Sequence, residues 1–115
     1  MHPKSPKSFE DIANAAANIV EWTANRTLTD YESDSFLRSA VERTFEIIGE
    51  ALLRLERTDP DTVARISDYR NIIGFRNRLA HGYDDTDHQQ VWDIINSFLP
   101  VLTTEVRTLP GNADA

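Results

Sequence analysis

The sequence predicts an all-α fold, a small bundle of four to five helices with a long second helix. Glycine (4 residues) and proline (5 residues) are scarce among the 115 residues. The alternation of β-branched residues that marks strands is nearly absent, whereas apolar residues recur at helical spacing. Hydrophobic residues make up 40% of the chain and charged residues 27%, as in an ordinary globular domain. We therefore expect a single domain over residues 1–115, with flexible tails at 1–7 and 110–115.

The first helix is predicted to begin at Ser8 and to run to about Ala24. Ser8 and Asp11 have the spacing of a capping box, with Asp in place of the usual Glu. Apolar residues then follow at helical spacing, namely Ile12, Ala16, Ile19 and Val20. The polar segment "NRTLTDYESD" connects this helix to the next and is a candidate to carry the next helix cap.

The second helix is predicted from about Asp34 to Arg57. Its apolar stripe consists of Leu37, Val41, Ile48, Ala51, Leu52 and Leu55, widened by Ala40, Phe45 and Ile47. About 24 residues at 1.5 Å each give a helix of roughly 36 Å, about the length of the whole domain. Because a small domain rarely covers such a stripe by itself, we expect part of it to form a homodimer contact.

Two further helices are predicted after the loop "TDPDTVARISD", which can hold a short turn. Ser67 or Asp68 caps a third helix that runs toward His81, and Gly82 suits the left-handed position beyond a helix end. A fourth helix begins near Thr86 or Asp87. Pro100 then either kinks this helix or begins a fifth one.

Composition also limits the cellular setting and the class of site. The chain has no cysteine, so it holds neither a disulfide nor a thiolate metal site. It has no apolar run of about 18 residues, and "MHPKSPKSFE" lacks the apolar stretch of a signal peptide. We therefore expect a cytoplasmic protein. The net charge of −7 argues against wide, non-specific nucleic-acid binding but permits a local basic pocket.

The segment "RNRLAHGY" (76–83) gathers two arginines, a histidine and a tyrosine. Structural roles alone can explain each of them. His81 in the last turn of a helix is favoured by the helix dipole. Arg76 can pair with Asp68 or Asp84, and Tyr83 can pack its ring on the fourth helix. On an ideal helix Arg76 and Tyr83 share a face, while His81 lies about 140° away from Arg76.

The spacing of these residues resembles a known family. Arg76, four residues, His81, one residue and Tyr83 match the R-x4-H-x-Y motif of HepT-like toxins in the HEPN superfamily. The segment "AVERTFEIIGEALLRL" (40–55) is similar to the long second helix of that family, and "RNIIGFRNRLAHGY" (70–83) to its third. "HQQVWDII" also fits, so the resemblance covers about residues 11–95.

This resemblance implies a homodimer with both copies of the motif in one cleft. It also implies a metal-independent endoribonuclease without a cofactor, neutralised by an MntA-type nucleotidyltransferase antitoxin that transfers AMP onto Tyr83. Arg76 and His81 carry over as catalytic residues, and Asn77 and Tyr83 as RNA-binding residues. We add Arg78 to the RNA-binding candidates. With Arg70 it either extends a basic rim or balances nearby acids.

The chemistry of these side chains fits RNA cleavage independently of the family. RNA carries its own nucleophile, the 2′-OH, so the reaction needs a base, an acid and cations for the phosphorane charge. His81 titrates near neutrality and can serve as base or acid, and a dimer supplies two such histidines. Arg76 offers a forked, permanent cation for phosphate oxygens. Tyr83 can position the phosphate or stack on a base.

Other readings stay open at this point. The domain can be a catalytically inactive HEPN module that binds nucleotide or RNA, or a subunit that docks a nucleotidyltransferase. It can also be a plain helical dimerisation domain. The acidic and histidine residues at 81, 84, 85, 87 and 88 suit helix capping better than a metal site. Glu46 and Glu50 are expected to be solvated or paired with Arg43 and Arg54.

Overall fold

The computed structural model describes residues 1–80 and 87–113, with the side chains of residues 80 and 110–113 left out. The predicted all-α class is confirmed. The described part of the chain forms six helices: α1 (Ser5–Thr23), α2 (Leu28–Ser33), α3 (Ser35–Thr58), α4 (Pro60–Val63), α5 (Tyr69–Ala80) and α6 (His88–Ala113). The four long helices form the bundle. The two short ones, α2 and α4, raise the number above the expected four to five.

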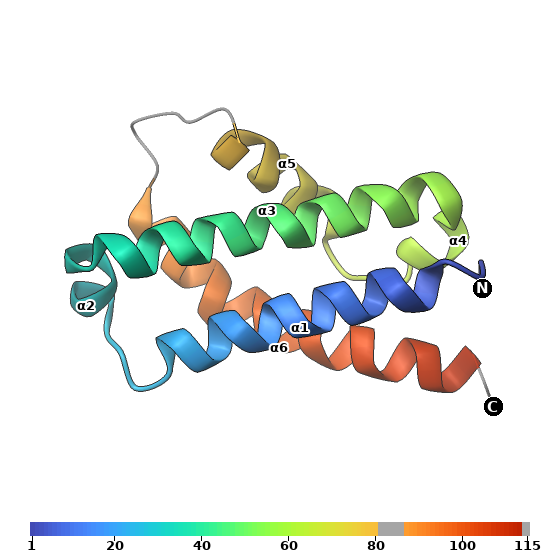
Figure 1. Cartoon of the computed structure of the whole chain (residues 1–115), viewed down its shortest axis with the longest axis horizontal. Coiled ribbons are helices and arrows are strands. Elements are labelled where there is room, and N and C mark those ends of the chain that lie inside the picture. The colour runs from blue at the N-terminus through green and yellow to red at the C-terminus, as the bar shows by residue number, and fades with distance from the viewer. Residues whose placement is uncertain (81–86, 114–115) are drawn as a thin grey trace.

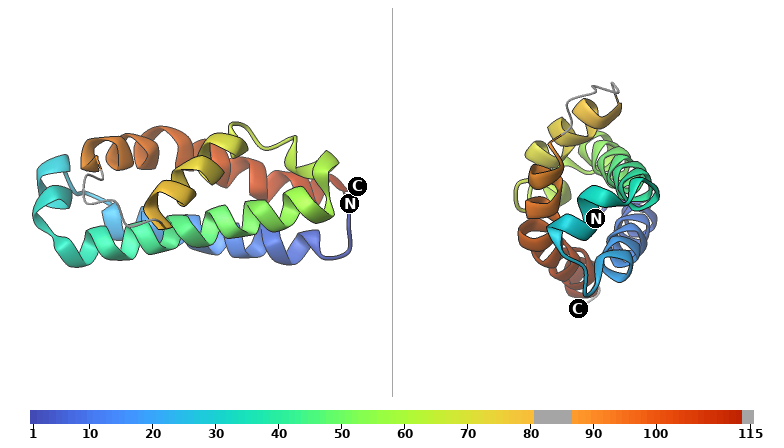
Figure 2. Two further views of the ribbon diagram at one scale, coloured as in Figure 1. Left: turned by 90° about the horizontal axis from the view of Figure 1, so that it is seen from above. Right: turned by 90° about the vertical axis from the view of Figure 1, so that its left-hand side faces the viewer.

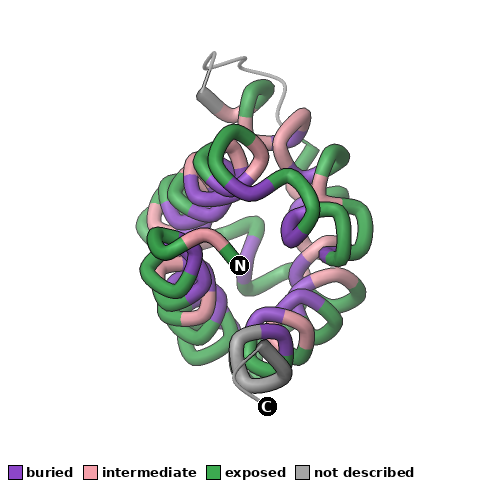
Figure 3. The backbone as a smooth tube through the Cα atoms, turned by 90° about the vertical axis from the view of Figure 1, so that its right-hand side faces the viewer, coloured by how far each residue is buried: buried purple, intermediate pink, exposed green. Residues whose placement is uncertain are grey.

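The helices α1, α3 and α6 run side by side along the long axis of the molecule (Figure 1). Helix α5 lies on one side of this group, across α3 and beside the first half of α6 (Figure 2). The buried residues face the interior that the helices enclose (Figure 3). That core includes Ile12 and Ile19 of α1, Phe45 and Leu52 of α3 and Leu102 of α6, all with no exposed surface.

Helix α1 begins three residues earlier than predicted, so the capping box at Ser8 is wrong. Ser8 is buried inside the helix, and Lys4 at the N-cap makes no capping bond with its side chain. Pro6 lies in the first turn, where its missing N–H costs nothing. Ser5 is also buried, and its hydroxyl donates to Asp59 (2.7 Å). Residues 5–7 therefore belong to α1 and not to a flexible tail.

The segment expected as a polar connection contains helix α2. Thr27 and Asp30 form a full capping box, in which each side chain accepts a bond from the backbone N–H of the other. Tyr31 of α2 is fully buried against Trp92, with ring centroids 5.5 Å apart. Burial raises the pKa of the Tyr31 hydroxyl. The connection is thus a packed part of the core.

The long helix α3 confirms the prediction at both ends, with Asp34 as its N-cap (Asp34 Oδ1 accepts from Leu37 N, 3.0 Å). The chain itself covers most of the apolar stripe of α3, whereas Ile47 at its edge is 36% exposed, so the expected dimer contact stays a prediction. The residues that make up the stripe itself are buried in the protomer, and so is Phe45. Helix α1 packs along one side of α3 and α5 along another, which together supply the missing cover.

Helix α6 settles the question raised by Pro100. It is one continuous helix of 26 residues, so Pro100 does not begin a separate fifth helix. Asp87 caps it, since Asp87 Oδ1 accepts from Gln90 N (3.2 Å). The helix extends to Ala113, so residues 110–113 are helical and not an irregular tail. None of the helices in the described ranges combines the length and apolarity needed to cross a membrane.

Candidate functional site

Helix α5 carries three of the predicted site residues, Arg76, Asn77 and Arg78. The helix follows Asp68, whose backbone has a φ of 57° and whose carbonyl accepts from Asn71 N (3.0 Å). Its buried face packs on α3, where the Phe75 and Phe45 rings meet edge to face with centroids 5.3 Å apart. This packing fixes the rotation of α5 and therefore the direction of its polar side chains.

Arg76 lies against α3 at Gly49. A methyl group built on Gly49 would stand 2.3 Å from Arg76 Cβ and 2.4 Å from Arg76 Cγ, far inside van der Waals contact. Only a glycine lets the two helices approach this closely. The aliphatic stem of Arg76 therefore rests directly on the α3 backbone, and its side chain keeps 25% of its surface exposed.

The guanidinium of Arg76 meets acidic and polar groups from two helices. Its Nη1 donates to Asn77 Oδ1 (3.0 Å) and its Nη2 to Glu50 Oε1 (3.4 Å). Its Nε is buried and makes no hydrogen bond within the described parts of the chain. Because a guanidinium has five N–H donors, Arg76 retains capacity for an incoming anion.

Arg76 does not pair with Asp68, and its other expected partner, Asp84, lies outside the described residues.

Glu50 pairs with Arg76 and, more loosely, with Arg43 (3.8 Å). The expected partner Arg54 instead bonds Asp11 of α1 (3.0 Å). The predicted pairing of Glu46 with Arg43 is confirmed, at 3.0 Å. The predicted pair of Glu50 with Arg54 is thus not formed, and Glu50, which is 40% exposed, pairs instead with Arg76 of α5, a helix distant in the sequence.

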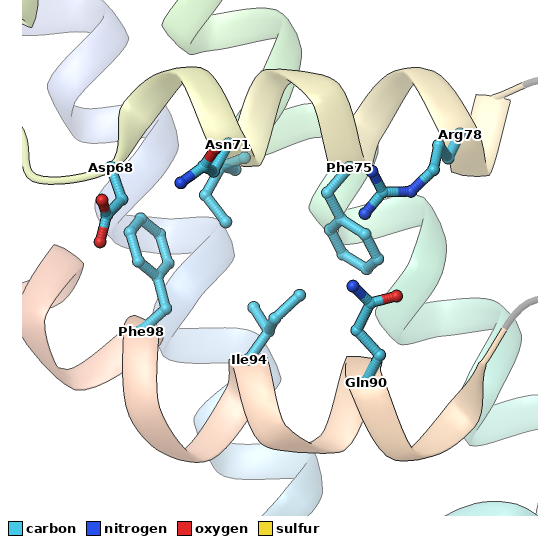
Figure 4. A pocket seen from close by; sticks show the side chains of 8 residues that line it. Asp68, Asn71, Phe75, Arg78, Gln90, Ile94 and Phe98 are labelled. Atoms are coloured by element: carbon cyan, nitrogen blue, oxygen red, sulfur yellow. The ribbon is translucent and has the colours of Figure 1, made fainter.

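Arg78 lies on the other side of α5 from Arg76. It lines a groove of about 400 Å³ between α5 and α6, together with Phe75 and, across the groove, Gln90 (Figure 4). Its guanidinium stands over the Phe75 ring at 5.8 Å from the centroid. The three consecutive candidates are thus divided, with Arg76 toward α3 and Arg78 toward α6. Arg70, the other arginine of the expected rim, donates to the Tyr69 hydroxyl (3.1 Å).

The remaining motif residues, His81 and Tyr83, lie outside the described residues, as does Gly82. In the chain they follow α5, which ends at Ala80, and precede α6, which begins at His88. The distance from Arg76 to the imidazole and phenol therefore stays a prediction. Of the five residues weighed as a metal site, only Asp87 and His88 are described. Residues 1–80 and 87–113 contain no group of three or more potential metal ligands among His, Asp and Glu.

Gly49 is the residue of the site that the sequence analysis missed. A signal was present, since glycine in the interior of a long, otherwise strong helix costs about 1 kcal/mol relative to alanine. An isolated glycine in such a helix often marks a close approach of another element. The sequence alone does not say which element approaches, and here it is the stem of Arg76.

The fold and the site define an all-α domain in which α5 directs Arg76 toward α3 and Arg78 toward α6, a few residues before His81 in the chain. Residues 12–109 match the model of the family described as Ribonuclease HepT-like. The chain therefore belongs to the HepT-like ribonuclease family, which confirms the resemblance drawn from the motif.

Relatives with ribonuclease names match nearly the whole chain. "Putative RNase MJ1380" of Methanocaldococcus jannaschii is 28% identical over 92% of this chain and 97% of the relative. "Putative RNase TTE0752" of Caldanaerobacter subterraneus is 26% identical over 92% of this chain and 95% of the relative. "Probable ribonuclease HepT" of Thermococcus cleftensis is 31% identical over 86% of this chain and 90% of the relative. No solved structure matches the chain.

Proposed function

We propose that this protein is a metal-independent endoribonuclease that acts as the toxin of a cytoplasmic HepT/MntA-type toxin–antitoxin pair. One observation carries the proposal. In a chain of the HepT-like ribonuclease family, Gly49 holds Arg76 on the α3 backbone with its guanidinium partly exposed, five residues before His81. An arginine held in this way is suited to bind a phosphate group.

Cleavage uses the 2′-OH of the RNA itself. The 2′-oxygen attacks the adjacent phosphorus, the bond from phosphorus to the 5′-oxygen breaks, and a cyclic phosphate and a 5′-hydroxyl form. One His81 takes the proton from the 2′-OH, and the His81 of a second copy gives a proton to the leaving 5′-oxygen. Arg76 neutralises the charge that builds on the phosphorane oxygens. This division of roles requires a homodimer.

The partner nucleotidyltransferase would silence this site by modifying Tyr83. The Tyr83 oxygen attacks the α-phosphorus of ATP, pyrophosphate leaves, and the tyrosine proton passes to a base. The attached AMP adds a phosphodiester charge and an adenosine close in sequence to Arg76 and His81. Both groups would occupy the space of the RNA substrate, whose phosphate needs the same cation.

The test of the ribonuclease compares His81→Ala and Arg76→Lys with the wild-type protein on total cellular RNA. We expect each variant to lose cleavage by about 10²-fold or more, with helix content and oligomeric state unchanged. Arg76→Lys keeps the packed stem and the charge but removes the fork. Arg65→Ala, at an exposed arginine outside the site, is the control and should cleave like the wild type. RNA binding without cleavage by the wild type would instead assign an inactive HEPN module.

The test of the modification is the intact mass of the protein after co-expression with an MntA-type nucleotidyltransferase. We expect a gain of one or more AMP units that maps to Tyr83 and disappears in Tyr83→Phe. An adduct that persists on Tyr83→Phe would contradict the assignment of the residue. An unmodified wild-type chain would contradict the pairing with the antitoxin and leave the ribonuclease test unaffected.

A further inference from the structure

The groove between α5 and α6 begins near the C-terminal end of α5. Asn71, Phe75 and Arg78 reach into it from α5, and Ile94 and Phe98 reach into it from α6 (Figure 4). Arg78, with Gln90 opposite it, lies toward the helix ends that residues 81–87 join (Figure 4). Arg78, which lines this end of the groove, follows Arg76 by two residues and precedes His81 by three in the chain.

The buried part of the groove lining is apolar. Phe75 is only 3% exposed and forms part of the floor, with Ile72 at 4%. Ile94 and Phe98 are half-buried, so parts of their side chains face the groove. A volume of about 400 Å³ with an aromatic ring in its wall suits a flat, apolar-faced group.

The rim of the groove is polar. Asn71 and Gln90 are exposed, and each amide offers both a donor and an acceptor. Arg78 adds donors at the end near the motif, and Asp68 adds an acceptor at the far end. One cation and one carboxylate do not select a phosphate. An apolar wall under mixed donors and acceptors is the chemistry that holds a nucleobase.

We propose that this groove is a nucleobase subsite, which takes the base of a nucleotide near the scissile phosphate. The proposal rests on the proposed ribonuclease function and names how that site would select its RNA. Only the width of α5, about 10 Å, separates the groove from Arg76. The bound base therefore belongs to a nucleotide within about two positions of the cleaved bond.

The experiment combines groove variants with abasic RNA. A short RNA that spans the cleavage site mapped for the wild type is prepared with an abasic ribose at each position in turn. We expect the abasic ribose at one position near the cut to raise the KM of the wild type by about tenfold, because a stacked base is lost there. The kcat should change little. The double variant Asn71→Ala/Gln90→Ala should have a higher KM than the wild type on intact RNA. The abasic penalty, meaning the rise in KM when that base is removed, should be small in this variant.

The control variant is Gln89→Ala, which removes an exposed amide next to Gln90 but outside the groove lining. It should keep the full abasic penalty of the wild type. Exposed positions are chosen so that folding is preserved, which circular dichroism and thermal melting verify. If the abasic penalty in the double variant equals that of the wild type, the proposal is overturned. It is equally overturned if the double variant alters only the sedimentation coefficient, because the groove then receives a second copy of the chain.

Failure of the proposed function can be told apart from failure of the subsite. If the wild type cleaves no RNA, the wild type and the double variant are compared by binding instead. Fluorescence anisotropy then measures the Kd of each protein for labelled intact and abasic RNA. A penalty that depends on both the base and the groove amides then supports the subsite in a protein that binds without cutting. Binding that ignores the base overturns the subsite whether or not RNA is cleaved.

Discussion

At the scale of single residues, Gly49 decides where Arg76 lies. In Gly49→Ala the new methyl would overlap the Arg76 stem, 2.3 Å from its Cβ, so α5 or the side chain has to move. We expect a loss of about 1–3 kcal/mol in the free energy of unfolding, as for other overpacked sites. RNA cleavage should fall more steeply than stability, because the guanidinium leaves its place. Urea unfolding and a cleavage assay on the same preparation measure both effects.

The matched control for this change is Gly74→Ala on α5. A methyl group at Gly74 meets nothing within 4 Å. Because alanine favours a helix interior over glycine, this variant should be more stable by about 0.5–1 kcal/mol and should cleave RNA normally. Equal stability losses at both glycines would show that the contact with Arg76 is not tight.

Under the proposed function, Glu50 would compete with the RNA phosphate for the guanidinium of Arg76. It lies 3.4 Å from Arg76 and is itself 40% exposed, so its pairing energy is small. We expect Glu50→Gln to bind RNA more tightly, by up to about fivefold, since a carboxylate no longer repels the phosphate. The measurement is the Kd for RNA as a function of salt. Glu46→Gln, whose ion-pair partner is Arg43, is the control. Weaker RNA binding by Glu50→Gln would mean that Glu50 orients Arg76 for substrate.

At the scale of elements, Asp59 ties the N-terminal segment to the turn between α3 and α4. Burial raises the pKa of its carboxyl, but donors from His2, Ser5 and Thr62 outweigh burial and lower the pKa to about 2. His2 N lies 2.8 Å from the carboxylate and the Ser5 hydroxyl 2.7 Å. The N-terminal segment is thus held by a buried charge that no apolar pattern reveals.

This carboxylate predicts an acid-sensitive component of stability. Its folded pKa lies below the ordinary value of 3.8, so the contribution is complete above about pH 4 and is lost as the pH falls toward 2. We expect that loss to be about 2 kcal/mol. Asp59→Asn should lack it and should be less stable than the wild type at neutral pH. Urea unfolding at a series of pH values tests this, and parallel pH curves for the two proteins would contradict it.

The elements were predictable where a local pattern decides them. Asp34 before a long apolar periodicity predicted the start of α3, and of the two residues Thr86 and Asp87 expected to begin the last helix, Asp87 caps α6. Helix α2 was missed because it is six residues long and its one buried anchor, Tyr31, packs on Trp92, far away in the sequence. The start of α1 was misplaced because Ser5 is stabilised by Asp59 and not by its own helix.

At the scale of the whole molecule, the apolar stripe of α3 belongs to the protomer core. Ile48→Ala should therefore lower the free energy of unfolding by about 2–5 kcal/mol, since Ile48 has no exposed surface. Phe36, which is 90% exposed, should tolerate Phe36→Ser with a change below about 0.5 kcal/mol. Urea unfolding at one protein concentration compares the two variants.

Dimerisation itself stays a prediction, and sedimentation velocity tests it. We expect the wild type to sediment as a species of twice the 13.1 kDa chain. Folded Ile48→Ala should sediment in the same way, because the substitution lies inside one protomer. If Ile48→Ala dissociates the dimer at unchanged stability, the stripe is an interface after all.

The sequence by itself determined the helical class, the long helix, the arginine–histidine–tyrosine spacing and the family. These features are local or periodic, so they can be read along the chain. Only the tertiary structure decided which partner each charge takes, that Gly49 holds Arg76, and that Arg76 and Arg78 face different helices. These outcomes depend on how helices distant in sequence pack together, and the free energy of that packing is shared among residues that no local pattern connects.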